Sequence, residues 1–117
     1  MARIEGVGPD APTIINEKGA RQSSSPYRFD LLPPLALAHI ASVMKIGAEK
    51  YGANSYIDIN PDDHLNHALQ HIFAYCAGDI QEGDVIEHAK HAACRIMFWL
   101  ECLERNMQDD DTDTEDR

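Results

Sequence analysis

The sequence predicts an all-α fold, a helical bundle of three long helices plus one short helix, completed by self-association. Three observations predict it. Apolar residues recur at helical spacing in three stretches, and each stretch has its own start and stop signals. No stretch alternates between apolar and polar residues for long enough to build a sheet. The 117 residues suit one domain, but three helices of this length bury little surface, so we expect copies to associate.

The first long helix is expected to begin after Asp30. Pro33 and Pro34 suit its first turn, where a missing backbone N–H costs little, and Gly52 suits its end. One side would carry the apolar residues Leu35, Leu37, Ala38, Ala41, Met44 and Ala48. The residues before this helix show no clear period, so we expect an irregular N-terminal arm over residues 1–29.

The second helix has a strong start signal in "NPDD". Asn60 suits the N-cap, Pro61 the first helical position, and the two acidic residues the first turn. The helix is expected to run to Ala77, because Gly78 follows. Its apolar stripe would consist of Leu65, Ala68, Leu69, Ile72 and either Tyr75 or Cys76.

The third helix is expected to begin with a capping box formed by Asp84 and Glu87. Its broad apolar face predicts close packing against other helices and comprises Val85, Ile86, Ala89, Ala92, Ala93, Ile96, Met97 and Leu100. We therefore expect a helical domain over residues 30–107. The remaining residues, 108–117, are almost all acidic or polar and predict a disordered tail.

The formal net charge of -10 disfavours binding to DNA or RNA, which depends on Lys and Arg at the phosphates. No apolar run reaches the length that spans a membrane, and the first residues lack the apolar core of a signal peptide, so we expect a cytoplasmic protein. Cys76, Cys94 and Cys102 each lie within an apolar helical pattern and are expected to be buried thiols.

Two rows of histidines are the most unusual feature of the sequence. Five of the six histidines have helical spacing, and they are His64, His67 and His71 in one row and His88 and His91 in the other. If the two helices pack antiparallel, both rows can face one pocket. Imidazoles there can bind metals, accept protons or donate hydrogen bonds to phosphates. A single helical histidine usually has a structural role, as we expect for His39, but five in register favour a function.

MazG-like nucleotide pyrophosphatases, which are all-α, offer a comparison for this layout. They carry E-x-x-E on one helix and E-x-x-D on the next, whereas this chain has H-x-x-H in both places. Two alternatives follow. Either imidazoles replace the metal-binding carboxylates, or Glu49, Asp63 and Glu87 supply the oxygens, although helix N-termini also explain the last two.

Polar segments on either side of the first helix suit a nucleotide. Cations, hydroxyls and free N–H groups bind polyphosphate oxygens, a tyrosine can stack on a base, and an asparagine can read its polar edge. These residues are also compatible with ordinary loops. The candidates for substrate binding are Lys18, Arg21, Ser23, Arg28, Lys50, Tyr51 and Asn54.

Four segments in this order, "GARQSSSPYRFDLLPP", "GAEKYGANSY", "DHLNHALQH" and "HAKHAA", resemble the phage dATP/dGTP diphosphohydrolase family, a MazG-like branch. The resemblance covers residues 17–104, with Ser55 and Tyr56 where relatives often carry Trp. It implies hydrolysis of a purine deoxynucleoside triphosphate to the monophosphate and pyrophosphate. In phages this would supply dGMP for 2-aminoadenine nucleotides and lower the dATP pool. It also implies a homodimer or homotetramer in the host cytoplasm, with sites between subunits.

The resemblance further implies divalent metals, Mn²⁺ or Mg²⁺ with Co²⁺ as an alternative, and a nitrogen-rich site would favour Mn²⁺ or Co²⁺. The candidate ligands are Glu49, His64, His67, Glu87, His88 and His91. His67 and His71 are the candidates for catalysis, with His71 acting as a base, binding phosphate or only capping the cluster by hydrogen bonding. Lys18, Arg21, Arg28 and Lys50 would hold the β- and γ-phosphates.

Two other functions can be compared with this one. Phosphohydrolases of the HD type need an adjacent His-Asp pair, and the sequence contains no such dipeptide. The remaining alternative is a non-catalytic helical oligomer that binds a metal or a nucleotide.

Overall fold

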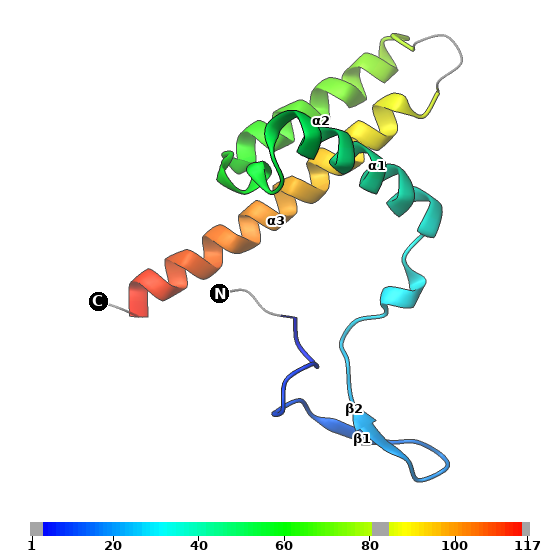
Figure 1. Cartoon of the computed structure of the whole chain (residues 1–117), viewed down its shortest axis with the longest axis vertical. Coiled ribbons are helices and arrows are strands. Elements are labelled where there is room, and N and C mark those ends of the chain that lie inside the picture. The colour runs from blue at the N-terminus through cyan, green and yellow to red at the C-terminus, as the bar shows by residue number, and fades with distance from the viewer. Residues whose placement is uncertain (1–3, 81–84, 116–117) are drawn as a thin grey trace. The chain divides into compact units, whose positions relative to one another are not determined.

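A computed structural model describes residues 4–80 and 85–115. The chain forms two units, Met1–Leu32 and Pro33–Arg117. The first contains a short hairpin and the second contains three long helices, as Figure 1 shows. The all-α prediction is confirmed by the second unit, while the first adds a small sheet that was not predicted.

The N-terminal unit contains an antiparallel hairpin of β1, Thr13–Ile15, and β2, Arg21–Ser23. Its turn is held by the side chain of Asn16, which accepts hydrogen bonds from the backbone N–H groups of Lys18 and Ala20. A short 3-10 helix, η1, follows at Phe29–Leu31. The prediction of a fully irregular arm was therefore wrong for these segments, because three-residue strands are too short to display an alternating pattern.

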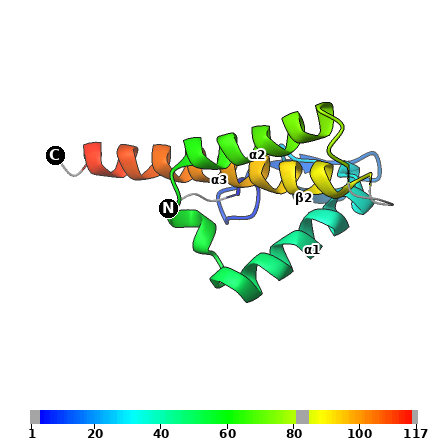
Figure 2. The same ribbon diagram turned by 90° about the horizontal axis from the view of Figure 1, so that it is seen from above.

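The helical unit consists of α1 at Pro34–Tyr51, α2 at Pro61–Cys76 and α3 at Glu87–Glu115, with a 3-10 helix, η2, at Ser55–Asp58. Helices α2 and α3 run antiparallel along each other, and α1 packs on α3 at an angle (Figure 2). The antiparallel pair brings the two histidine rows toward the same seam, as the sequence predicts.

The predicted start and stop signals are confirmed where the structure describes them. The Asn60 side chain accepts a hydrogen bond from the N–H of Asp62 at 2.9 Å, with Pro61 at the first helical position. Gly52 ends α1 at a φ of 93°, and Gly78 follows α2 at 83°, where a side chain would be strained. The predicted capping residue Asp84 lies outside the described residues.

Small side chains and one histidine form the buried core of the helical unit. The buried residues are His64, Ala68, Ala92, Cys94 and Cys102. Thus His64, Ala68 and the half-buried His71 form the inner line of α2. Of the apolar stripe predicted for this helix, Ala68 is buried, whereas Leu69 and Ile72 are exposed. The buried thiols are confirmed at two cysteines but not at Cys76, which is exposed at the end of α2.

The apolar side of α1 differs from the prediction. No residue of α1 is buried, and Leu35 is 80% exposed. The less exposed line consists of Ile40, Val43, Met44 and Gly47, which shares only Met44 with the predicted set. Both faces of this helix carry apolar residues, so periodicity alone could not choose between them. The exposed apolar residues are compatible with self-association, which remains a prediction.

Helix α3 continues into the acidic tail as far as Glu115, which the composition of that tail does not predict. Pairs one turn apart support the preceding part: Arg105 bonds to Glu101, and Gln108 to Glu104. Extending a formed helix also costs less than starting one. In the part of the chain that the structure describes, no helix has both the length and the apolar character needed to cross a membrane.

Candidate functional site

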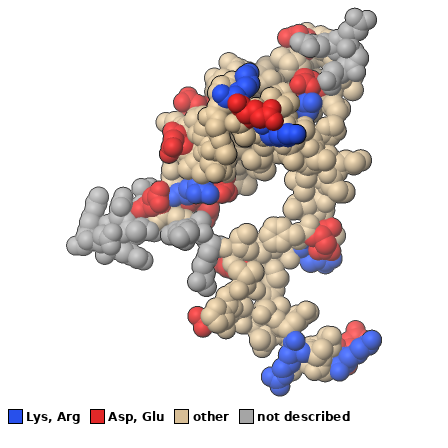
Figure 3. Space-filling view, in the orientation of Figure 1, with Lys and Arg blue, Asp and Glu red and all other residues tan. Residues whose placement is uncertain are grey.

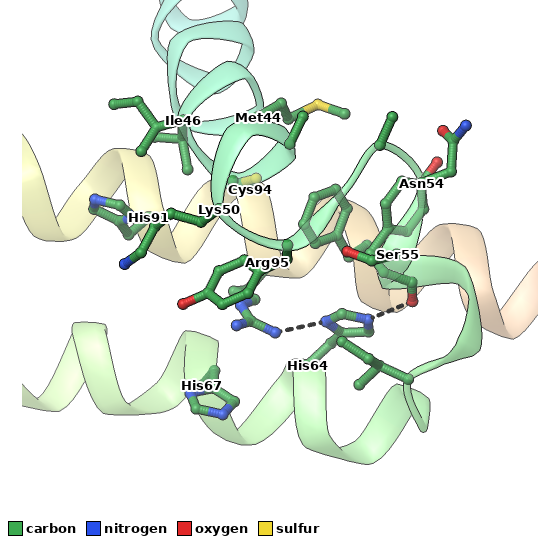
Figure 4. A pocket seen from close by; sticks show the side chains of 18 of the residues that line it. Met44, Ile46, Lys50, Asn54, Ser55, His64, His67, His91, Cys94 and Arg95 are labelled. Carbon is green, nitrogen blue, oxygen red and sulfur yellow. Dashed lines mark hydrogen bonds between the residues drawn. The ribbon is translucent and has the colours of Figure 1, made fainter.

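A cleft of about 780 Å³ lies within the helical unit, a volume in the range of small-molecule binding sites. It is bordered by the C-terminal half of α1, the η2 connector, and the facing sides of α2 and α3 (Figure 4). Its cationic and imidazole side chains are Lys50, His64, His67, His71, His91 and Arg95.

The cleft has no acidic side chain among its described lining residues, although the chain contains 20 Asp and Glu residues. On the face of the molecule seen in Figure 3, acidic and basic side chains are interspersed. The cleft is therefore a local exception in an acidic protein. Its lysine and arginine, without a described carboxylate on the lining, favour an anionic ligand over a cationic one.

His64 is fully buried and uses both ring nitrogens within the protein. Its Nε2 lies 3.0 Å from the carbonyl oxygen of Tyr56, and its Nδ1 lies 3.0 Å from Nη1 of Arg95. A carbonyl can only accept and a guanidinium can only donate, so we assign a neutral ring with its proton on Nε2. Neither nitrogen is then available to a metal ion, unlike the ligand role predicted from the sequence.

His71 and His88 form a directed hydrogen-bond chain. Nε2 of His88 donates to the carbonyl of Asp79, so its Nδ1 is left to accept from Nδ1 of His71, 3.0 Å away. No described residue bonds to the Nε2 of His71, so this nitrogen keeps its lone pair. Burial first, and then the nearby charges of His91, His88, Arg95 and His67, lower the pKa of His71, so its ring is neutral at pH 7.

His91 stacks on His71, with ring centres 5.1 Å apart. Its Nε2 donates to Oε1 of Glu87 at 2.9 Å, and Oε2 of the same carboxylate binds Lys90 at 2.9 Å. In its neutral form, His91 keeps Nδ1 as an acceptor. Glu87 does not line the cleft, and both its oxygens contact neighbours on α3, so this predicted ligand orients a histidine in the structure.

The other predicted residues fall into three groups. Lys50, Tyr51, Asn54 and His67 line the cleft, whereas Glu49 and His88 do not. The candidates Lys18, Arg21, Ser23 and Arg28 belong to the N-terminal unit and do not line the cleft of the helical unit. Arg28 pairs there with Asp30 at 2.9 Å. His39 is exposed on α1, so the packing role predicted for it was wrong.

Arg95 continues the second histidine row in the sequence, but sequence reasoning assigned it no role in the site. It follows His91 by one helical turn and therefore shares its face, which was a usable signal. Cys94 and Phe98 also line the cleft. Burial raises the pKa of the Cys94 thiol, so it contributes a neutral surface there.

The described residues of one chain do not form the metal centre that the resemblance implies. Among them, no group of three or more His, Cys, Asp and Glu side chains could hold an ion. The nitrogens of His64 are occupied, and Glu49 and Glu87 lie outside the cleft lining. The described side chains of this chain alone can therefore bind an anion through Lys50 and Arg95 and transfer protons through imidazoles.

Fold and cleft together define a class: an all-α protein with a cleft lined by cationic and imidazole side chains. A family model described as "dATP/dGTP diphosphohydrolase, N-terminal" matches residues 16–112, and the chain belongs to this family. The predicted resemblance is thereby confirmed. Comparisons with curated proteins and with solved structures find no match.

Proposed function

We propose that this protein hydrolyses dATP and dGTP to the monophosphate and pyrophosphate. The observation that carries the proposal is the cleft without described acidic lining residues, in a chain that belongs to a diphosphohydrolase family. A triphosphate concentrates negative charge, and the cleft is where this acidic protein offers Lys50 and Arg95 together. The cleft volume of about 780 Å³ also suits a nucleotide.

Lys50 and Arg95 are proposed to bind the phosphates from two sides, since one comes from α1 and the other from α3. Arginine can bind two phosphate oxygens at once, whereas lysine acts as a point charge. Tyr51 and Asn54 border the same cleft and are proposed to contact the base. His67, also on the lining, is proposed to donate a hydrogen bond to a phosphate oxygen.

His71 is proposed as the general base. Its free Nε2 lone pair can take a proton from a water molecule as the water oxygen attacks the α-phosphorus. The bridging P–O bond between the α- and β-phosphates then breaks, and pyrophosphate leaves with the bonding electrons. Two features support this role: the lowered pKa of His71 keeps its ring unprotonated, and the bond to His88 fixes the ring.

The function is tested by product analysis with the common ribo- and deoxyribonucleoside triphosphates in the presence of a divalent cation. We expect dGMP or dAMP together with pyrophosphate. Release of inorganic triphosphate or orthophosphate would contradict the proposed bond cleavage. Tight nucleotide binding without turnover would instead favour the non-catalytic binding protein.

Metal dependence is a further part of the proposal and comes from the family resemblance. The described side chains of one chain form no group of three that could hold an ion, but the imidazoles of His67 and His91 border the cleft, and nitrogen donors suit Mn²⁺ or Co²⁺ better than Mg²⁺. Protein treated with EDTA should lose hydrolysis and regain it more fully with Mn²⁺ than with Mg²⁺. Undiminished hydrolysis after EDTA would refute the metal requirement, and the highest rate with Mg²⁺ would indicate oxygen ligands.

The proposed biological setting is the nucleotide pool of a phage-infected cell, where dGMP would feed 2-aminoadenine synthesis. We propose a homodimer or homotetramer for this enzyme. The exposed apolar residues of α1 outside the cleft lining, such as Leu35 and Leu37, support self-association because soluble monomers rarely expose large contiguous apolar areas.

A further inference from the structure

We infer that His64 is a positioning residue, which holds the guanidinium of Arg95 in the cleft as a neutral hydrogen-bond acceptor. The inference rests on the proposed function in one respect, that the anion bound by Arg95 is a nucleotide phosphate. His64 is the only fully buried polar side chain among the described residues, and it bonds directly to Arg95 (Figure 4). Because His64 is buried and both of its ring nitrogens are hydrogen-bonded, its ring is held in one orientation beside Arg95.

Arg95 has a charge without an acidic partner in the described structure. It is half-buried, and no carboxylate of the described residues lies within ion-pair distance of it. A partly desolvated guanidinium without a counter-charge is unfavourable until an anion arrives. This arrangement is what a phosphate-binding arginine requires, because a permanent carboxylate partner would compete with the ligand.

A neutral hydrogen-bond acceptor can orient the Arg95 guanidinium without cancelling its positive charge. A carboxylate beside Arg95 would fix its direction but cancel its charge, whereas an imidazole lone pair fixes the direction and leaves the charge intact. Only the tautomer with its proton on Nε2 can accept at Nδ1. The Tyr56 carbonyl, 3.0 Å from Nε2, selects that tautomer.

The Tyr56 carbonyl is itself held in place by α3. The Tyr56 ring stacks on Phe98 with centres 4.2 Å apart and planes 3° from parallel. The thiol of Cys102, one turn further along α3, donates to the same carbonyl at 3.3 Å. The chain of contacts from η2 through His64 to Arg95 therefore joins three elements around the cleft. It fixes one guanidinium N–H and leaves the others for phosphate oxygens.

The test measures inorganic pyrophosphate binding by calorimetry, because this probe needs no turnover. In His64→Gln the side-chain nitrogen can keep the Tyr56 bond but the acceptor for Arg95 is displaced, so affinity should fall about 10-fold. In His64→Asn the side-chain oxygen can replace Nδ1 as acceptor, so affinity should stay within about 3-fold of wild type. Circular dichroism verifies that each variant is folded.

A double-mutant cycle separates positioning from general destabilisation. His64→Gln should weaken pyrophosphate binding in the wild-type background and cause no further loss when combined with Arg95→Ala. Equal losses in both backgrounds would overturn the inference, as would wild-type protein that does not bind pyrophosphate. Should the variants not fold, ¹⁵N NMR of the wild-type imidazoles decides: a proton on Nδ1 of His64 would overturn it, and a proton on Nε2 alone supports it.

The same measurements distinguish this inference from the proposed function. Pyrophosphate binding with intact coupling between His64 and Arg95, but no hydrolysis of any nucleotide, would refute the enzyme and leave the positioning role standing. Nucleotide hydrolysis without coupling between His64 and Arg95 would support the enzyme and refute the positioning role.

Discussion

Replacing His71 by alanine is expected to lower kcat for dGTP and dATP by about 100- to 10,000-fold, the usual contribution of a general base. KM should change less, because the phosphates are proposed to be held by Lys50 and Arg95. The measurement is steady-state kinetics with pyrophosphate detection. His39→Ala is the matched control, since His39 is exposed on α1 and does not line the cleft. A His71→Ala variant with wild-type kcat would remove this residue from the mechanism.

The pH dependence of kcat/KM tests the same role independently. The pKa of His71 is lowered from its usual 6.5 by burial and by the surrounding imidazoles and Arg95. The basic form therefore persists below pH 6.5, and the rate should fall only as the pH drops through that lowered pKa. This acid limb should disappear from the residual activity of His71→Ala. A limb at or above pH 6.5 in the wild type would contradict the assignment.

Replacing Arg95 by alanine is expected to reduce kcat/KM by about 100- to 1,000-fold, comparable with the loss of one donor to a developing oxyanion. Arg95→Lys keeps the charge but loses the planar fork and the bond to His64, so it should recover only part of this loss. Both variants should also bind inorganic pyrophosphate more weakly than the wild type.

Arg105→Ala provides the control for Arg95. Arg105 lies on the same helix, is exposed, and pairs with Glu101 at 3.2 Å outside the cleft lining. Its loss should leave kcat/KM within about 2-fold, since exposed ion pairs contribute little. Equal effects of the two substitutions would mean that overall charge, rather than the position of Arg95, determines substrate binding.

Much of the helical fold could be predicted because its signals are local. Asn60, Pro61 and Gly52 act within one turn of their own helix, so the sequence nearby is sufficient to place the ends. The hairpin at Thr13–Ile15 and Arg21–Ser23 could not be predicted in this way, since three-residue strands have no period. The orientation of α1 was also missed, because it depends on which of two apolar faces meets α3.

In the candidate site, the positions of the histidines could be predicted from local spacing, whereas their hydrogen-bond partners could not. Helical spacing correctly predicted that His71 and His91 would approach each other across the seam. The surroundings of His64 could not be inferred, because its two hydrogen bonds come from Tyr56 and Arg95 on other elements. A histidine pattern thus indicates where rings gather, whereas the partners of each nitrogen depend on tertiary structure.

The cleft without described acidic residues has a consequence for how a nucleotide would arrive. At a distance, a protein of formal charge -10 repels a polyanion, while close to Lys50 and Arg95 the attraction is local. Added electrolyte screens the distant repulsion first, because the Debye length is about 10 Å at 0.1 M. The association rate of a nucleotide should therefore rise at modest ionic strength, and binding should weaken only when salt ions compete for Lys50 and Arg95. For an enzyme with a basic surface, by contrast, the association rate falls steadily as salt is added.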